Sequence, residues 1–176
     1  LDLCCGTGRA LIEAAQLLDA EPSGRQVTID GIDLVPMFEP IPAGIGCLQL
    51  RAADLQTWTA DKAYDLVTCV HGMHYIGDKL ALIAKAATSL KNHGLFVAHI
   101  DLPTQRKLAQ SPSGEQGIRP LRGVFRHPGL SYDGKRRILK CQGRQDLAFG
   151  YRYLGASYRA GPNFTGQDAV DSYYRR

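Results

Sequence analysis

The chain begins with Leu1-Asp2-Leu3-Cys4-Cys5-Gly6-Thr7-Gly8, and the rest of the fold can be predicted outward from this stretch. The apolar start is typical of the end of a strand, and Gly6-Thr7-Gly8 is typical of a tight turn. Residues 9–19 are strong helix formers whose apolar members follow the i, i+3, i+4, i+7 spacing of an amphipathic helix. Backbone amides at such a helix start favour an anionic group of a ligand.

Strands and helices alternate over the next ninety or so residues. Further strands are predicted over Val27–Leu34, Cys47–Ala52, Asp65–His71 and Leu95–Ile100. A second helix is predicted over Asp78–Lys91, with Asn92-His93-Gly94 as its stop. The prolines and glycines of residues 35–46 exclude a long helix there. This alternation predicts a parallel α/β sheet.

The pattern changes after residue 101. Residues 102–129 contain four prolines and four glycines, and long connections of this kind are usually functional or mobile. We therefore expect a mobile cover over a ligand site. Tyr132-Asp133-Gly134-Lys135 predicts a hairpin turn, and strands are expected over Arg136–Cys141 and Asp146–Leu154.

A chain of 176 residues is expected to form one domain. We divide it into a cofactor-binding half (1–101), the mobile connection (102–129) and C-terminal strands with a tail (130–176). The first strand retains only Leu1–Cys4. We therefore expect an N-terminally truncated domain, less stable than a chain that extends further upstream.

Composition excludes several protein classes. With 44% hydrophobic and 22% charged residues, the chain is neither disordered, collagen-like nor a disulfide miniprotein. No run approaches the ~18 apolar residues of a membrane span. The five cysteines are odd in number and include no C-x-x-C pair. They predict reduced thiols in a cytoplasmic protein, with no disulfide framework and no metal site.

Charge is unevenly distributed. Residues 1–100 hold 7 Lys and Arg against 11 Asp and Glu, whereas residues 101–145 hold 10 against 3. Such a basic segment is either a solvated surface or a face for an anionic partner such as RNA. It lacks the interleaved aromatic residues that single-strand binders use.

Acidic and polar residues follow the ends of successive predicted strands, where open α/β sheets bind their ligands. Asp33 stands where such sites place a carboxylate on ribose hydroxyls. Asp54 is placed to accept a hydrogen bond from the amine of adenine. If Gly6 and Gly8 began a G-x-G-x-x-G dinucleotide loop, its third glycine would be Leu11, which argues against that loop.

At these positions the sequence resembles the class I S-adenosylmethionine-dependent methyltransferases. The matching stretches, in order, are 1–8, Ile32-Asp33-Leu34, Ala53-Asp54-Leu55, Tyr64-Asp65-Leu66-Val67 and 90–96. The resemblance implies a Rossmann-like, doubly wound, mostly parallel seven-stranded α/β sheet with a C-terminal antiparallel hairpin. It also implies S-adenosyl-L-methionine as the cofactor.

The same resemblance implies a set of cofactor-binding residues: Asp2, Cys4, Gly6, Thr7, Gly8, Asp33, Leu34, Asp54, Leu55, Val70 and His71. Asp2 and the glycine loop would hold the methionine part, Asp33 the ribose, and Asp54 the adenine amine. Leu34 and Leu55 would pack beside adenine. Two departures from the family pattern are Cys4, where glycine is frequent, and the prolines after Asp33.

No catalytic residue follows from the pattern, because methyl transfer needs mainly alignment and exclusion of water. His71, His74 and Tyr75 are candidates for removing a proton from the acceptor or contacting it, and packing is the alternative for each. Asp33 could instead cap a helix, and Asp54 could be a turn residue.

The predicted function is methyl transfer to an acceptor, with a small molecule favoured and an RNA or protein acceptor still open. The fourth predicted strand is not followed by Asn-Pro-Pro-Tyr or Asp-Pro-Pro-Tyr, which argues against the common amino-methylating nucleic-acid enzymes. Two alternatives are a nicotinamide-dependent Rossmann oxidoreductase and a catalytically silent methyltransferase-like binding protein.

Overall fold

A computed structural model describes residues 1–20, 27–100, 108–110, 112, 114, 116–118, 122–162 and 166–176 of the chain. The described helices are α1 (Arg9–Asp19) and α2 (Lys79–Thr88), with 3₁₀ turns η1 (Met73–Tyr75) and η2 (Arg122–Phe125). The described strands are β1 (Asp2–Leu3), β2 (Ile29–Asp33), β3 (Leu48–Ala52), β4 (Tyr64–Cys69), β5 (Leu90–His99), β6 (Leu108–Gln110), β7 (Gln116–Ile118), β8 (Leu130–Asp133), β9 (Ile138–Gln142), β10 (Arg152–Pro162) and β11 (Asp168–Arg175).

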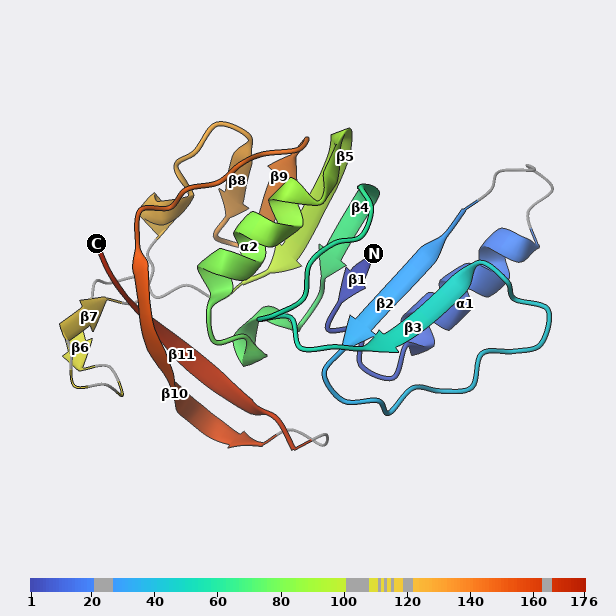
Figure 1. Cartoon of the computed structure of the whole chain (residues 1–176), viewed down its shortest axis with the longest axis horizontal. Coiled ribbons are helices and arrows are strands. Elements are labelled where there is room, and N and C mark those ends of the chain that lie inside the picture. The colour runs from blue at the N-terminus through green and yellow to red at the C-terminus, as the bar shows by residue number, and fades with distance from the viewer. Residues whose placement is uncertain are drawn as a thin grey trace.

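The main sheet has seven strands in the order β3-β2-β1-β4-β5-β9-β8 (Figure 1). Strands β1 to β5 are parallel to one another, whereas β9 runs antiparallel to both β5 and β8. The predicted fold class, a doubly wound and mostly parallel sheet closed by an antiparallel hairpin, is confirmed. A second sheet, β10-β11-β7-β6, is fully antiparallel and was not predicted.

Helix α1 packs closely on β2 because that strand carries a glycine where the helix crosses it. A Cβ atom on Gly31 would lie 2.6 Å from Leu11 Cδ1 and 2.6 Å from Leu50 Cδ2. Leu11 occupies the place where a dinucleotide loop has its third glycine, and Gly31 supplies the close approach from the strand side. The helix begins at Arg9, and Gly8 caps it in a left-handed conformation with φ +78°.

The second helix is shorter than predicted. It ends at Thr88, and the expected stop Asn92-His93-Gly94 belongs to β5. Pairing with β4 overrides the capping signal: the register passes from Tyr64↔Leu90 to Leu66↔Leu95, which leaves a bulge between them. Gly94 serves this bulge, since a Cβ atom there would stand 2.7 Å from the Tyr64 carbonyl oxygen.

The strand predicted over Asp146–Leu154 was also misplaced. Residues 144–151 carry no regular element, and β10 begins at Arg152. The apolar alternation of this segment reflects packing instead of strand pairing, because Leu147 is buried and Phe149 packs on the same core. The predicted turn at 132–135 is confirmed, and it joins β8 to β9.

The connection 102–129 lies only partly within the described residues. Strands β6 and β7 pair with each other, and β7 pairs with β11 at Ile118↔Tyr174. Residues 101–107, 111, 113, 115 and 119–121 lie outside the described residues. The mobile cover therefore stays a prediction.

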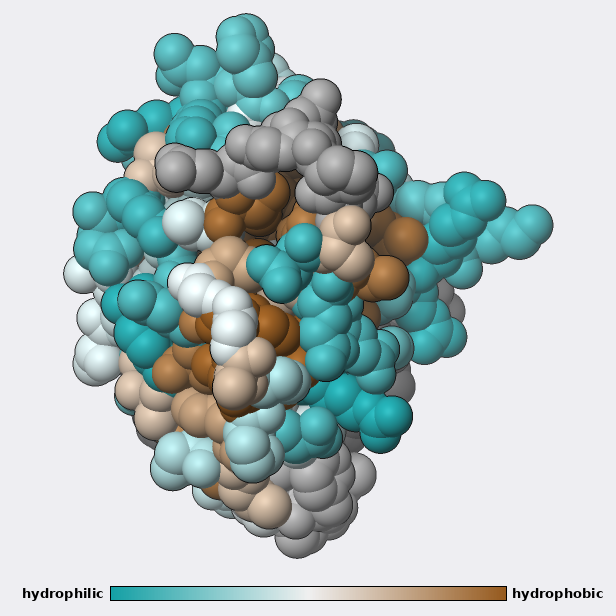
Figure 2. Space-filling model, turned by 90° about the vertical axis from the view of Figure 1, so that its right-hand side faces the viewer, coloured by the Kyte–Doolittle hydropathy of each residue, from teal (hydrophilic) through white to brown (hydrophobic). Residues whose placement is uncertain are grey.

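Apolar side chains remain exposed on the loop that follows β2. Leu34 is 56% exposed and Met37 is 51% exposed. Figure 2 views the molecule from the side of this loop and α1, and apolar atoms gather in the middle of that face. Neither α-helix of the described residues has the length and apolarity needed to cross a membrane.

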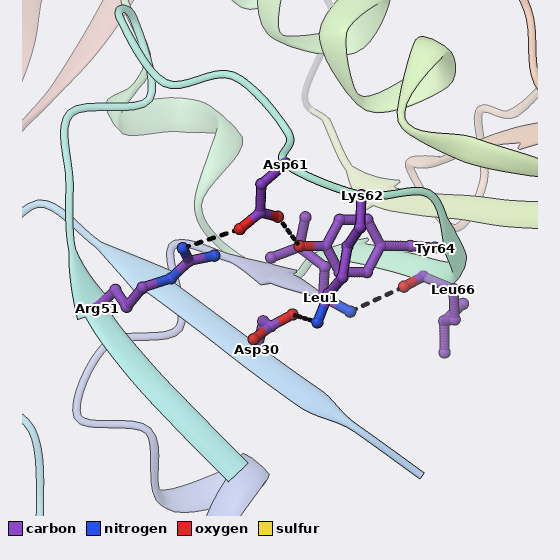
Figure 3. A network of polar contacts seen from close by, with 7 residues as sticks. All are labelled: Leu1, Asp30, Arg51, Asp61, Lys62, Tyr64 and Leu66. Carbon is purple, nitrogen blue, oxygen red and sulfur yellow. Dashed lines mark hydrogen bonds and ion pairs between the residues drawn. The ribbon is translucent and has the colours of Figure 1, made fainter. Parts of the chain in front are cut away.

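A polar network holds the start of β4 against β2 and β3 (Figure 3). Asp30 is buried on β2, and Lys62 Nζ pairs with its Oδ2 at 2.8 Å. Asp61 accepts hydrogen bonds from Arg51 at 3.4 Å and from the Tyr64 hydroxyl at 3.3 Å. A buried carboxylate needs such a partner, and Lys62 supplies it for Asp30.

The second sheet is attached to the first through the start of α2. Lys79 is 6% exposed, and its Nζ donates to Ile76 O at 2.8 Å, Val170 O at 3.0 Å and Ser172 Oγ at 2.8 Å. The Tyr174 hydroxyl donates to Asp78 Oδ1 at 3.1 Å and accepts from the Leu80 amide at 3.2 Å. These contacts fix β11 beside α2 and η1.

Replacing Lys79 with methionine should lower the free energy of unfolding by about 3 kcal/mol, because buried acceptors lose a charged donor while the side chain's apolar stem is retained. Urea denaturation measures the change. The matched control is Lys91→Met, which removes an exposed pair with Asp65 and should cost less than ~1 kcal/mol. Equal effects of the two substitutions would contradict an anchoring role for Lys79.

Candidate active site

Two adjoining cavities lie at the carboxyl ends of β1, β2 and β4, with volumes of about 280 and 60 Å³. We call them together the cleft. The larger cavity is lined by Cys4, Cys5, Gly6, Thr7, Asp33, Val35, Met37, Val70, His71, Gly72, Tyr75 and Gln167. The smaller cavity is lined by Cys4, Asp33, Leu34, Asp54, Leu55, Gln56, Tyr75, Ile76 and Gln167.

The glycine loop forms one wall of the cleft. Gly6 has φ +60°, and, its chain neighbours aside, no atom of the described residues lies within 4 Å of the position that its Cβ would occupy. The loop is held by the segment after β2, because the Glu39 amide donates to Thr7 O at 2.9 Å and Thr7 Oγ1 donates to Glu39 Oε1 at 3.3 Å. Gly6 thus leaves open space next to a fixed backbone, which suits close approach of a ligand.

Asp33 joins the two cavities. It is 8% exposed, and its Oδ2 accepts from the Gly6 amide at 2.9 Å while its Oδ1 accepts from the Val35 amide at 3.1 Å. A carboxylate offers about four acceptor sites. Asp33 therefore fixes the glycine loop and keeps acceptor capacity for two further donors, such as a pair of hydroxyls.

Asp54 is both a turn residue and a wall of the smaller cavity. Its Oδ1 accepts from the Gln56 amide at 2.8 Å, which closes an Asx turn. Lys85 of α2 holds this turn by donating to the carbonyl oxygens of Leu55 and Gln56. The turn is therefore fixed from the helix side, and Asp54 keeps a second carboxylate oxygen for a ligand.

The end of β4 has an unusual backbone. His71 has φ +58° and Cys4 has φ +61°, conformations that non-glycine residues adopt rarely. The two segments touch at Gly72, where a Cβ atom would lie 2.3 Å from Cys4 Cβ. Strain of this kind concentrates at functional sites. The Cys4 position, where glycine is frequent in the resembling family, has the left-handed backbone that favours glycine.

Two further rings stand near this strained turn. The His99 ring lies 5.0 Å from the His71 ring between centroids, and His99 Nδ1 is buried without a hydrogen-bond partner among the described residues. His74 packs on Tyr75 with centroids 4.0 Å apart. Tyr75 lines both cavities, whereas His74 lines neither.

The cysteines of the site are thiols. All five cysteines of the chain are free. Burial, reinforced by Asp2 and Asp33, raises the pKa of Cys5 to about 12. A hydrogen bond with Cys4, together with burial, raises the pKa of Cys69. Thiols held protonated at neutral pH are weak nucleophiles, which favours packing for Cys5 and Cys69.

Most of the predicted cofactor-binding residues come together in the cleft. Those that line it are Cys4, Gly6, Thr7, Asp33, Leu34, Asp54, Leu55, Val70 and His71. Asp2 and Gly8 do not: the Asp2 carboxylate accepts from Thr68 Oγ1, and a Cβ atom on Gly8 would meet Leu50 Cδ1 at 2.5 Å. Burial raises the pKa of Asp2.

Several lining residues were missed by sequence reasoning: Cys5, Val35, Met37, Gln56, Gly72, Ile76 and Gln167. Most of them are direct neighbours of predicted residues, so a wider window around each strand end would have found them. Gln167 is different, because it lies in a tail segment with no recognisable motif and directly precedes β11 of the second sheet.

The charged residues that line the cleft are acidic. Asp33 and Asp54 contribute carboxylates, and no Lys or Arg is among the described residues that line either cavity. Opposite charges attract strongly when they are partly buried. The arrangement therefore favours a ligand that carries a positive charge or hydrogen-bond donors over a polyanion.

A family model described as "Methyltransferase domain" matches residues 1–129. No protein of curated function matches the sequence. The coclaurine N-methyltransferase structure, bound to N-methylheliamine and SAH, is 19% identical with a TM-score of 0.50, over 63% of this chain and 32% of that one.

Two other solved structures are similar at low identity. The plantazolicin methyltransferase BpumL, in complex with a pentazolic desmethylPZN analog and SAH, is 16% identical with a TM-score of 0.45, over 55% of this chain and 36% of that one. An S-adenosylmethionine-dependent methyltransferase from Mesorhizobium loti is 15% identical with a TM-score of 0.43, over 99% and 89%. The matched part of this chain thus spans about a third of BpumL.

Proposed function

Because the chain belongs to the methyltransferase domain family, we propose that it transfers the methyl group of S-adenosylmethionine to an acceptor molecule. The observation that carries the proposal is the meeting of Gly6, Asp33 and Asp54, from three different strand ends, around one cleft. Each supplies a feature that the cofactor needs: open space beside backbone, a carboxylate for ribose, and a carboxylate for the adenine amine.

The residues present fit this cofactor. Asp33 would accept from the ribose hydroxyls while it still holds the Gly6 amide. Leu34 and Leu55 would pack on the adenine ring beside Asp54. The loop of Gly6 and Thr7, with Cys4, would border the methionine part, and Val70 and His71 would lie where the acceptor enters. Asp2 does not line the cleft, so any role for it would be indirect.

The charge of the cleft supports this cofactor over a nicotinamide dinucleotide. S-Adenosylmethionine carries a sulfonium cation, whereas a dinucleotide brings a pyrophosphate that would lie at the glycine loop and the start of α1. No cation from the described lining residues would balance it. The side chain of Leu11, packed at Gly31, also occupies the position of the dinucleotide loop's third glycine.

When bound, the cofactor supplies a methyl group attached to a sulfonium sulfur. The thioether that remains is a good leaving group, which suits in-line displacement. The chain's contribution would be to hold the acceptor in line and to exclude water. If the acceptor atom is a hydroxyl or an amine, one proton must also leave. We assign its removal to His71, which lines the larger cavity at the end of β4.

The acceptor we propose is a small molecule with an apolar body. Val35, Met37 and Val70 line the larger cavity, and Leu34 and Met37, on the loop after β2, are exposed. Apolar side chains gathered beside a cavity mark ligand-binding grooves. A nucleic-acid acceptor would instead need cations at this mouth. The free cysteines support a reducing, cytoplasmic setting.

Methyl-labelled S-adenosylmethionine tests the acceptor class. The protein is incubated with the label and, separately, with a small-molecule extract, total RNA and a protein fraction from cells. We expect label in an organic-extractable product of the first incubation, and the same product to be lost with a Gly6→Val variant. Transfer only to RNA or protein would contradict the acceptor that we propose.

A further inference from the structure

We propose that Gln167 is part of the site and binds the nucleoside portion of the cofactor, closing the cleft from the second sheet. The inference rests on the proposed function. It assigns a residue that no strand-end motif includes, since Gln167 directly precedes β11 (Asp168–Arg175).

The position of Gln167 is shared by the two cavities. Four residues line both of them: Cys4, Asp33, Tyr75 and Gln167. Cys4 follows β1 and Asp33 ends β2, both of the main sheet, and Tyr75 lies in η1, which follows β4. Gln167 comes from the opposite side, and in Figure 1 the β10–β11 ribbon runs along the carboxyl ends of the parallel strands. Gln167 therefore completes a wall that the main sheet leaves open.

The strand next to this wall is anchored to the start of α2. The strand that follows Gln167 is held by the Lys79 ammonium through Val170 and Ser172, and by the hydroxyl of Tyr174 at the start of α2. Asp168, the next residue, pairs with Pro162 of β10. A residue next to an anchored strand is better suited to hold a ligand than one on a free tail.

The chemistry of the side chain selects the part of the ligand. A glutamine amide both donates and accepts hydrogen bonds and carries no charge. Asp33, which shares both cavities with it, is the proposed ribose ligand, and the smaller cavity also holds Asp54 and Leu55. An uncharged amide at this junction suits ribose hydroxyls and ring nitrogens of adenine. We therefore assign Gln167 to the nucleoside and not to the methionine part.

Calorimetric titration of a Gln167→Ala variant tests the assignment with two ligands, S-adenosylhomocysteine and 5′-methylthioadenosine. The second ligand has the nucleoside but lacks the amino-acid part. Loss of one or two neutral hydrogen bonds should weaken both ligands by a similar factor, about 3- to 10-fold. The matched control is Gln49→Ala, an exposed glutamine on β3 outside both cavities, which should bind like the wild type.

The outcomes separate this inference from the proposed function. If the wild type binds neither ligand, the proposed function fails and this assignment falls with it. If the wild type binds both and Gln167→Ala binds them equally well, only the assignment of Gln167 is overturned. Weakening confined to S-adenosylhomocysteine would also overturn it, because Gln167 would then contact the amino-acid part. An unchanged melting temperature confirms that the variant is folded.

Discussion

Replacing Gly6 with valine is expected to weaken S-adenosylhomocysteine binding by about 100-fold or more. Gly6 lies at φ +60°, a conformation that costs a side-chain-bearing residue ~1–2 kcal/mol. The added side chain would also project into the space beside the glycine loop, which the part of the chain that the structure describes leaves open at the Cβ position. The backbone would have to shift, or the ligand would lose that space.

Isothermal titration of the Gly6→Val variant measures the loss, and Gly46→Val is its matched control. Gly46 also has open space at its Cβ position but has no positive φ and lines neither cavity. Its substitution should leave affinity unchanged. A folded Gly6→Val protein that binds as tightly as the wild type would show that the loop does not approach the ligand.

Replacing Asp33 with alanine is expected to weaken S-adenosylhomocysteine about 10- to 150-fold, the range for losing hydrogen bonds to a charged group. The same substitution leaves the amides of Gly6 and Val35 without their acceptor. It should therefore also lower the melting temperature. Asparagine keeps one acceptor oxygen at this site, so Asp33→Asn should fall between alanine and the wild type in both measurements.

Affinity and thermal melting of the Asp33 variants are compared with those of Asp61→Ala. Asp61 is an exposed carboxylate whose partners, Arg51 and Tyr64, lie outside the cleft. Its loss should leave affinity unchanged. If Asp33→Ala lowered only the melting temperature and bound the ligand normally, Asp33 would be a structural residue of the loop and not a ribose ligand.

The first hundred residues show how far local sequence predicts this fold. Helix α1 begins and ends at Arg9 and Asp19 as predicted, because a strong apolar stripe coincides with glycine at its start. The strand ends that carry Asp33 and Asp54 were likewise predicted, since alternating strands and helices place them at one edge. These are local signals, and the site depends mainly on them.

The errors arose where long-range pairing competes with local signals. Asn92-His93-Gly94 has the composition of a helix stop, but pairing of β4 with β5 turns it into a bulge. Residues 144–151 alternate like a strand, yet their apolar members are buried by packing. The second sheet was not predicted because the pairing of β11 with β7 joins segments far apart in the sequence. Gln167 was missed for the same reason.

Calorimetric titration of the wild-type protein with S-adenosylhomocysteine and, in parallel, with NADH tests the central claim most directly. The open space at Gly6, the carboxylates of Asp33 and Asp54, and Leu11 in place of a third loop glycine predict saturable one-site binding of S-adenosylhomocysteine and no binding of NADH. Binding of NADH without S-adenosylhomocysteine, or binding of neither, would contradict the claim that this cleft holds a methyl-donor cofactor.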